Sequence, residues 1–367
     1  MSKPEVLRVA YTLEQCWHRV PGGTAVAAVE LARALKERND VSLIGIAAAH
    51  RMPPLDPFVP PVDVKHVPLP RLALYEAWHR FRAPRVERAT GRVDLIHATT
   101  LAIPPKSRPL VVTVHDLAWL KRPEHFTARG VRFFNRGLEL ALEDADLVLC
   151  PSEATKRDCV GAGWRPEKVR VVPLGVAVLP ATQAAVAEAV ARYGLQRPYV
   201  LWTGTVEPRK NLQALLDAWA AIDSAHDLVL VGPEGWNEHL DDRIDAAGGG
   251  VRRLGFVPQA DLAPLYAGAD AFCFPSLTEG FGFPVLEAMS QGTPVVTSRG
   301  TSTEELGGDA AVLVDPRDSG SIAEGLRSVL EDEALARKLA EAGPERAARY
   351  SWATTAENVA DAYAEVA

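Results

Sequence analysis

The chain has 367 residues, of which 47% are apolar and 24% are charged, and its formal net charge is −7 at pH 7. This length predicts two domains that each form a hydrophobic core, and the negative charge argues against wholesale nucleic-acid binding. The N-terminal residues lack the apolar segment of a signal peptide, and no run of about 18 apolar residues occurs, so we expect a cytoplasmic protein that does not cross a membrane. The cysteines show no metal-ligand spacing and are expected to be buried and reduced: Cys16, Cys150, Cys159 and Cys273.

The first predicted element is an apolar strand over residues 6–11, followed by a loop that ends near the glycine pair Gly22-Gly23. A helix is predicted to follow, over residues 25–37. Glycines at a helix N-terminus let backbone N–H groups approach an anion closely. The pair does not match the dinucleotide fingerprint G-x-G-x-x-G, however, and a mobile connection explains it equally well.

An arginine-rich region, residues 71–92, follows a second predicted strand over residues 41–47 and a proline-rich stretch over residues 52–70. Aromatic and basic side chains recur in it at helical spacing, together with one leucine: Leu72, Tyr75, Trp78, His79, Arg82 and Arg85. Such a face could dock on anionic lipid or receive an acidic or lipid-linked acceptor. The alternative is a helix that packs on the core and exposes its arginines to solvent.

A histidine and an aspartate, His115 and Asp116, come directly after a predicted buried strand over residues 110–114. A side chain at the carboxyl end of a parallel strand faces the crevice where ligands bind, so His115 is a candidate site residue with Asp116 as its orienting partner. The alternative is a histidine that only forms hydrogen bonds to its neighbours and takes no part in binding. Asp144-Ala-Asp146 spells the D-x-D pattern of metal-dependent transferases, but it precedes an apolar strand and is better interpreted as turn residues.

The second half begins with a predicted strand over residues 199–202, and Glu207, Arg209 and Lys210 follow it at the predicted start of a helix. Phosphate oxygens are favoured at a helix N-terminus, and arginine offers a planar fork where lysine offers a point charge. The pattern therefore favours a phosphate site, with a solvated charge cluster as the alternative.

The most informative stretch runs from residue 271 to residue 298 and predicts one strand–loop–helix–strand step of a parallel sheet. Its loop carries Glu279, Gly280 and Gly282, and its helix carries Glu287. The glycine amides favour an anion, while the two carboxylates are good acceptors for sugar hydroxyls. For an isolated pair of glutamates, a helix cap and a solvated charge would be the simpler interpretation.

Residues 279–296, Glu-Gly-Phe-Gly-Phe-Pro-Val-Leu-Glu-Ala-Met-Ser-Gln-Gly-Thr-Pro-Val-Val, resemble the signature of glycosyltransferase family 4, the retaining sugar-nucleotide transferases of the GT-B fold. The resemblance implies an α/β protein with two doubly wound Rossmann-like domains that face each other across a cleft. Residues 1–175 would form the acceptor domain and residues 176–349 the donor domain. Residues 350–367 would form a terminal helix that returns to the first domain.

The resemblance also implies roles for individual residues. The glutamate matching Glu279 contacts the donor sugar, Glu287 binds the ribose, and Arg209 and Lys210 bind the diphosphate, while His115 hydrogen-bonds the sugar near the reacting centre. The catalytic residues would thus be His115, Arg209, Lys210 and Glu279. The donor-binding residues would be Gly22, Gly23, Glu207, Val257, Gly280, Phe281, Gly282, Phe283 and Glu287.

The expected reaction is retaining transfer of a hexose from a nucleotide sugar to a hydroxyl of a glycan, lipid-linked or small-molecule acceptor, without a metal or other cofactor. The segments Val114-His115-Asp116-Leu117 and Glu124-His125-Phe126 resemble those of members that use GDP-mannose. Peripheral contact with the inner face of a membrane, through residues 71–92, remains an additional hypothesis. Two alternatives stay open: a nucleotide-sugar epimerase of the same architecture, and a non-catalytic subunit that binds sugar nucleotides.

Overall fold

The computed structural model describes residues 6–177, 179–235, 243–244, 247 and 250–367. The chain divides into two compact units, and each is described by itself. Unit 1 comprises Met1–Gly175 and Ser351–Ala367, and unit 2 comprises Val176–Tyr350.

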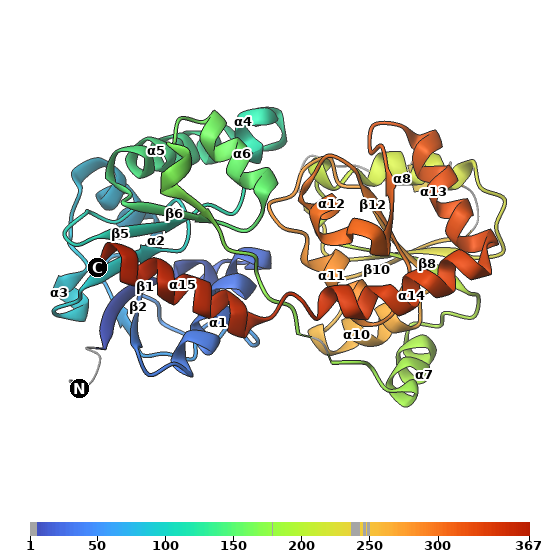
Figure 1. Cartoon of the computed structure of the whole chain (residues 1–367), viewed down its shortest axis with the longest axis horizontal. Helices are drawn as coiled ribbons and strands as arrows, with labels where there is room; N and C mark the ends of the chain where they lie inside the picture. Colours follow the sequence, from blue (N-terminus) through green and yellow to red (C-terminus); the bar gives the residue numbers. More distant parts are fainter. Residues whose placement is uncertain (1–5, 178, 236–242, 245–246, 248–249) are drawn as a thin grey trace. The chain divides into compact units, whose positions relative to one another are not determined.

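A parallel sheet of seven strands forms the centre of unit 1 (Figure 1), in the order β3-β2-β1-β4-β5-β6-β7. The order reverses between β1 and β4, which is the switch point where doubly wound sheets bind ligands at the carboxyl ends of their strands. The strands are β1 (Leu7–Thr12), β2 (Val41–Ala47), β3 (Val64–His66), β4 (Leu95–Ala98), β5 (Leu110–Thr113), β6 (Leu147–Cys150) and β7 (Val169–Val171).

Helices cover both faces of this sheet because alternate strand residues point to opposite sides. Val9, Tyr11 and Leu149 pack with α1 and α15 on one face, while Ala10 and Val148 belong to the core on the other. The helices are α1 (Gly22–Lys36), α2 (Arg71–Glu76), α3 (Glu87–Thr90), α4 (Ala118–Lys121), α5 (Ala128–Asp144), α6 (Glu153–Gly161) and α15 (Trp352–Val366).

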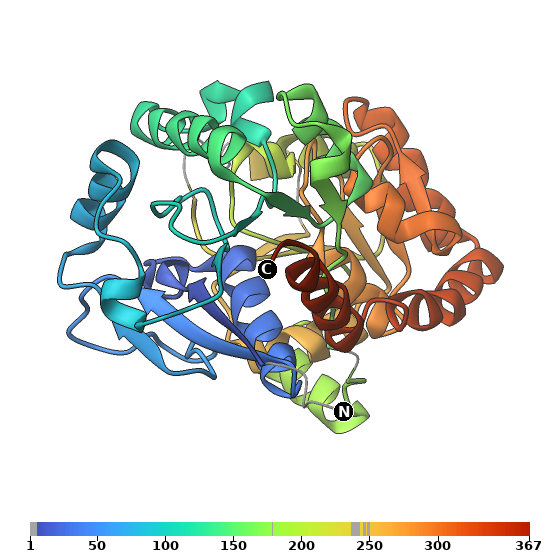
Figure 2. The ribbon, with the colours of Figure 1, turned by 60° about the vertical axis from the view of Figure 1, so that its left-hand side comes forward.

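The terminal helix α15 belongs to unit 1, as predicted, although the whole of unit 2 precedes it in the chain. It lies beside α1 in both ribbon views (Figures 1 and 2). Polar contacts fix it to the rest of unit 1: the Tyr363 hydroxyl lies 2.6 Å from His97 Nδ1 on β4, Glu365 pairs with Arg170 on β7, and the Thr355 hydroxyl donates to the carbonyl of Pro173 at 2.8 Å. Burial lowers the pKa of His97 to about 3, so the imidazole at this joint is neutral.

Unit 2 repeats the same topology with six parallel strands, in the order β10-β9-β8-β11-β12-β13. Its order reverses between β8 and β11. The strands are β8 (Tyr199–Thr203), β9 (Asp227–Val231), β10 (Val251–Gly255), β11 (Ala271–Phe274), β12 (Val295–Ser298) and β13 (Ala311–Val314). The helices are α7 (Gln183–Arg192), α8 (Leu212–Ala220), α10 (Gln259–Ala267), α11 (Phe283–Ser290), α12 (Ser302–Gly307), α13 (Ser319–Glu331) and α14 (Glu333–Ala347). Both units therefore have the predicted doubly wound architecture.

Of the two interpretations of residues 71–92, the structure supports the segment that packs on the core, and its aromatic and basic residues do not share one continuous helical face. The helix α2 continues as a π-helical turn over Ala77–Phe81 and stops at Arg82, which adopts a left-handed φ of 51°. Pro84 follows two residues later, and a proline disfavours helical geometry in the residue before it. Trp78 is buried, and Arg82 donates hydrogen bonds to the carbonyls of Trp78, Ile103 and Pro104. This segment therefore packs on the core of unit 1.

The aspartates of the D-x-D pattern, at the junction between α5 and β6, have structural partners. Asp144 pairs with Arg82, and Asp146 accepts a hydrogen bond from the backbone N–H of Leu110 at 2.8 Å. Within the described ranges, no helix is long and apolar enough to cross a bilayer.

Candidate active site

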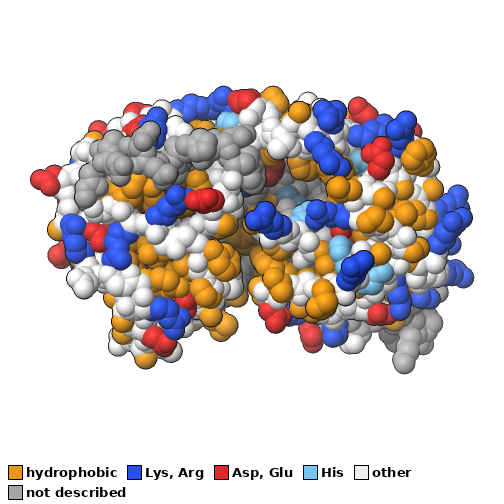
Figure 3. All heavy atoms as spheres, turned by 180° about the vertical axis from the view of Figure 1, so that it is seen from behind, with side chains coloured by type: hydrophobic (Ala, Val, Ile, Leu, Met, Phe, Trp, Pro, Cys, Tyr) orange, Lys and Arg blue, Asp and Glu red, His pale blue; other side chains and the backbone are white. Residues whose placement is uncertain are grey.

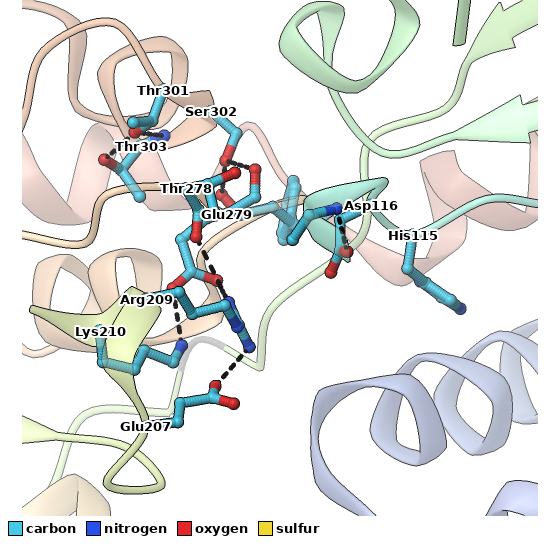
Figure 4. Close-up of polar contacts among 12 residues, drawn as sticks. His115, Asp116, Glu207, Arg209, Lys210, Thr278, Glu279, Thr301, Ser302 and Thr303 are labelled. Atoms are coloured by element: carbon cyan, nitrogen blue, oxygen red, sulfur yellow. Dashed lines mark hydrogen bonds and ion pairs between the residues drawn. The ribbon is translucent and has the colours of Figure 1, made fainter. Parts of the chain in front are cut away.

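The predicted basic pair and the first signature glutamate meet at the carboxyl edge of the sheet in unit 2. Arg209 and Lys210 lie in a 3₁₀ turn after β8, and Glu279 lies in the loop after β11. Because β8 and β11 are adjacent parallel strands, residues 70 apart in the chain come into contact. Lys210 Nζ donates to Glu279 at 2.7 Å and Arg209 Nη1 at 2.8 Å, while Arg209 also pairs with Glu207 at 2.7 Å (Figure 4).

This cluster is electrically balanced, with two carboxylates against two cations. The side chains of Arg209 and Lys210 are 20% and 10% exposed, whereas those of Glu207 and Glu279 are 6% and 7% exposed. Burial alone would raise the pKa of the Glu279 carboxyl, but the charges of Arg209 and Lys210 outweigh it and lower that pKa to about 2. Arg209 is the most exposed of the four side chains, so an approaching anion meets its guanidinium first.

Asn211, which directly follows the basic pair, fixes the turn that carries it. This residue adopts a left-handed φ of 59°, which asparagine tolerates better than most residues. Its side-chain amide donates to the carbonyls of Pro275 at 2.9 Å and Pro316 at 2.6 Å. These bonds tie the loop after β8 to the loops after β11 and β13, which fixes the cations relative to Glu279.

The second signature glutamate, Glu287, lies on α11 and has a partner that the sequence analysis missed. The hydroxyl of Tyr266 donates to its carboxylate at 2.9 Å and lies 2.7 Å from the Thr203 hydroxyl. Burial raises the pKa of Glu287, opposed by the Tyr266 hydrogen bond and the charge of Lys210. Tyr266 is 2% exposed, and a buried phenol needs such a partner. Its place on α10 gave no local signal that it would reach Glu287.

The glycine loop is held in one conformation, and Gly280, Phe281 and Gly282 are buried in unit 2. Gly282 has a φ of +117°, and a Cβ there would lie 2.8 Å from Thr303 Cγ2, so a side chain would clash. The Ser302 hydroxyl contacts the carbonyls of Glu279 and Phe281 at 2.9 and 2.7 Å (Figure 4). The remaining predicted loop residues, Gly280 and Phe283, lie in the same segment, and α11 begins at Phe283.

Val257, predicted to meet the nucleobase, follows β10 and is 4% exposed. The residue is therefore buried within unit 2, and its contact with a nucleobase stays a prediction. The preceding residue, Phe256, is 77% exposed.

The predicted glycine loop of unit 1 is instead the first turn of α1. The helix begins at Gly22, three residues earlier than expected, and Gly23 lies inside it. Gly22 has a φ of +64°, and no atom lies within 4 Å of the position a Cβ would take. The helix start is therefore conformationally suited to glycine and sterically open.

His115 lies just beyond the carboxyl end of β5, as predicted, but Asp116 does not orient it. The carboxylate of Asp116 accepts from the backbone N–H of Ala118 at 3.0 Å, and its side chain turns away from the imidazole (Figure 4). His115 Nε2 donates instead to the carbonyl of Thr99, at 3.1 Å, at the end of the neighbouring strand β4. Burial lowers the pKa of His115, opposed by Asp116 and by that carbonyl, so the ring is neutral at pH 7.

Two Rossmann-like units, one of which carries a basic pair and two carboxylates at its switch point, define the GT-B class of sugar transferases. Residues 188–346 match the family model of glycosyl transferases group 1, and residues 21–178 match that of glycosyltransferase family 4. The chain belongs to the group 1 glycosyltransferases, as its signature predicted. It is similar to O-antigen chain mannosyltransferase B of Escherichia coli, with 32% identity over 73% of this chain and 74% of that protein. It is also similar to a D-inositol 3-phosphate glycosyltransferase of Salinispora tropica, with 32% identity over 94% of this chain and 81% of that protein.

Solved structures of low sequence identity share the fold. HepE of Anabaena in complex with UDP-glucose superposes with a TM-score of 0.77 at 22% identity, covering 98% of this chain and 100% of that one. Sucrose-phosphate synthase of Thermosynechococcus elongatus gives 0.75 at 21% identity, covering 98% of each chain. These neighbours confirm the GT-B fold.

Proposed function

We propose that this glycosyltransferase moves a hexose from a nucleoside diphosphate sugar to a hydroxyl group of a carbohydrate acceptor and retains the anomeric configuration. The observation that carries the proposal is the convergence of Arg209, Lys210, Glu279 and Glu287 in unit 2. Mannose from GDP-mannose is the donor we favour, because mannosyltransferases from Escherichia coli are among the similar proteins.

Each member of the cluster has a chemical task in this reaction. Arg209 and Lys210 bind the diphosphate and stabilise the negative charge that develops on it as the bond to the sugar breaks. The incoming diphosphate competes with Glu279 for the two cations, which turns the carboxylate toward the sugar hydroxyls. Glu287, held by Tyr266, accepts hydrogen bonds from the ribose, and the amides of residues 280–283 donate to the sugar and the diphosphate. Within unit 1, Gly22, Gly23 and His115 are proposed as ligand-binding residues at the carboxyl edge of that unit's own sheet.

The bond changes balance without an external base. The acceptor oxygen forms a bond to the anomeric carbon, and the bond from that carbon to the leaving phosphate oxygen breaks. The acceptor proton passes to that phosphate oxygen on the same face, and the nucleoside diphosphate leaves. Two positive side chains supply the charge neutralisation, so we expect turnover to persist when a chelator removes divalent metal ions.

The decisive experiment combines donor binding with turnover. A panel of nucleotide sugars is screened for protection against thermal unfolding, and the protective donor is then incubated with candidate glycans while nucleoside diphosphate release and the anomeric configuration of the product are measured. Lys210→Ala should abolish release, whereas Lys338→Ala, an exposed lysine on α14, should not. Normal turnover by the Lys210 variant would defeat the site assignment. Conversion of the donor alone into a different sugar would identify an epimerase, and binding without turnover would identify a non-catalytic subunit.

A peripheral membrane contact through residues 71–92 is proposed in a narrower form than the sequence predicted, together with a cytoplasmic location. Leu72 and Phe81 are 52% and 67% exposed, and the guanidinium of Arg80 lies 5.6 Å from the Phe81 ring centroid. Exposed apolar side chains beside a cation suit binding to an anionic lipid surface or to a lipid-linked acceptor. The protein should co-sediment with anionic vesicles at low salt, and Phe81→Ser should weaken this. Failure of the unmodified protein to co-sediment would end the idea.

A further inference from the structure

An aromatic ring that has no part in the contacts assigned above lies against Lys210. The Nζ atom of Lys210 is over the ring of Phe274, 4.7 Å from its centroid, while the same nitrogen donates to Glu279 at 2.7 Å. Phe274 is the last residue of β11. An ammonium group within about 6 Å of a ring centroid is attracted by the negative face of the ring. The ring therefore stabilises the charge of Lys210 in addition to the carboxylate of Glu279.

The aliphatic part of the Lys210 side chain is also confined, by the backbone that follows β8. A Cβ placed on Gly204 would lie 3.7 Å from Lys210 Cε and 3.4 Å from the indole of Trp202. Gly204 has a φ of +153°, which few residues other than glycine adopt. The lysine therefore runs close to the backbone of this turn before its nitrogen reaches the ring of Phe274.

The ring of Phe274 is itself held in place inside unit 2. Phe272 lies on the same face of β11, because alternate strand residues share a face, and it stacks on Phe274 with centroids 5.8 Å apart and planes 20° apart. The hydroxyl of Thr297 on β12 donates to the carbonyl of Phe274 at 2.9 Å. Other apolar side chains reach the surface of unit 2, on the left of Figure 3, but both phenylalanines are fully buried. Phe274 can therefore affect a ligand only through its neighbours.

A neutral ring suits this position better than a second carboxylate would. Burial lowers the pKa of Lys210, and the charge of Glu279 is the main influence that opposes this shift. In the proposed reaction, however, the donor diphosphate competes with Glu279 for the same ammonium group. A second carboxylate would stabilise the ammonium but repel the diphosphate, whereas the ring stabilises the ammonium without carrying a net charge.

We infer that Phe274 is a positioning residue for glycosyl transfer: its ring holds the Lys210 ammonium charged and in place while the diphosphate replaces Glu279 as its partner. The inference rests on the proposed function, because the diphosphate is the ligand proposed for Lys210. Phe274 acts through Lys210 and makes no contact with the donor. An apolar residue at the end of a buried strand gives no local signal of this role in the sequence.

The test replaces Phe274, in the full chain, with phenylalanine that carries one, two or three fluorine atoms on the ring. Fluorine withdraws electrons from the face of the ring and weakens its attraction for a cation, while the size of the ring changes little. The affinity for GDP or UDP, and kcat/KM for the nucleotide sugar, should both fall with each added fluorine, by about tenfold in total. The matched control is the same series at Phe272, which is equally buried on the same strand face and should leave both quantities within about twofold.

The outcomes separate this inference from the proposed reaction. Constant affinity and constant kcat/KM across the Phe274 series would overturn the inference, even if sugar transfer is normal. An equal decline in the Phe272 series would also overturn it, because the effect would then come from packing. If no nucleotide sugar is turned over but the affinity for GDP or UDP still falls with each fluorine at Phe274 alone, the positioning role stands and the proposed reaction fails.

Discussion

Replacing Glu279 with glutamine separates the two tasks that the structure gives this residue, neutralising buried cations and accepting sugar hydroxyls. Glutamine preserves the size of the side chain and one acceptor oxygen but removes the negative charge. The two cations, Lys210 and Arg209, would then lose their shared ion-pair partner, while the ion pair between Arg209 and Glu207 would remain. Breaking a buried ion pair from one side is costly because the remaining charge lacks compensation.

The magnitude follows from the pKa of Glu279, which falls from its ordinary value of 4.5 to about 2 in the folded protein. A shift of this size contributes about 3 kcal/mol to the free energy of unfolding. Because the folded pKa is the lower one, this contribution is fully present above pH 4.5 and is lost as the pH falls toward 2. At pH 7 Glu279→Gln should therefore lose about 3 kcal/mol, which for a unit of this size lowers Tm by about 6–12 °C. Below pH 4.5 the difference from the unmodified protein should shrink.

Ligand binding provides the second half of the test. Removing one negative charge changes the balanced cluster to a net positive one, so GDP or UDP alone should bind the variant as tightly as the unmodified protein or more tightly. Turnover of the nucleotide sugar should nevertheless fall, because the proposed contact to the sugar hydroxyls is weakened. Chemical denaturation at pH 7 and pH 4 measures the free energy of unfolding. Calorimetry with GDP and UDP measures nucleotide affinity, and initial rates measure turnover.

The matched control is Glu324→Gln, which removes the same charge from an exposed position on α13 in the same unit. It should change stability and nucleotide affinity little. The reasoning would be refuted if Glu279→Gln were as stable as this control at pH 7, or if it bound GDP and UDP more weakly while transferring sugar normally.

Two further predictions concern buried polar side chains. Tyr266→Phe removes the hydrogen bond to the carboxylate of Glu287, worth about 1.5–3 kcal/mol, so the KM for the nucleotide sugar should rise about 10- to 100-fold. Tyr199→Phe, whose hydroxyl donates to a backbone carbonyl at 2.7 Å, should leave that KM unchanged, and equal effects of both variants would contradict the role of Tyr266. The pKa of His97 falls from 6.5 to about 3, so its contribution to stability is present above pH 6.5 and is lost as the pH falls toward 3, amounting to about 2 kcal/mol by pH 5. His97→Gln should therefore reduce the loss of stability between pH 7 and pH 5, measured by chemical denaturation, and an identical pH dependence would disprove this.

Local sequence predicted the elements of the candidate site well where the signal was long and regular. The strand–loop–helix–strand step predicted over residues 271–298 is present as β11, the glycine loop, α11 and β12, because a glycine stands at each end of the helix and apolar strands flank it. The prediction for residues 71–92 had a different outcome, because helical spacing was present there but the chain turns at Arg82. Periodicity reports which residues could share a face. It does not report a left-handed residue or the core into which Trp78 packs.

Partners across the sheet were the part that sequence reasoning missed. Asp116 was expected to orient His115 because it is the next residue, yet the orienting group is the carbonyl of Thr99 on the neighbouring strand. Likewise, Tyr266 reaches Glu287 from a different helix. Side-chain hydrogen bonds of this kind depend on which strands and helices become neighbours, and that information is not local.

The amino-acid sequence by itself determined the family, the doubly wound architecture and the residue types of the site, because strand and helix patterns and the long signature are local properties of the chain. The tertiary structure alone decided that Glu279 neutralises Lys210 and Arg209, and that the ring of Phe274 lies against Lys210. The physical reason is the order of the strands. In both sheets, crossover connections make neighbours of strands that are distant in the chain, and only at their shared carboxyl edge do these charges and this ring come into contact.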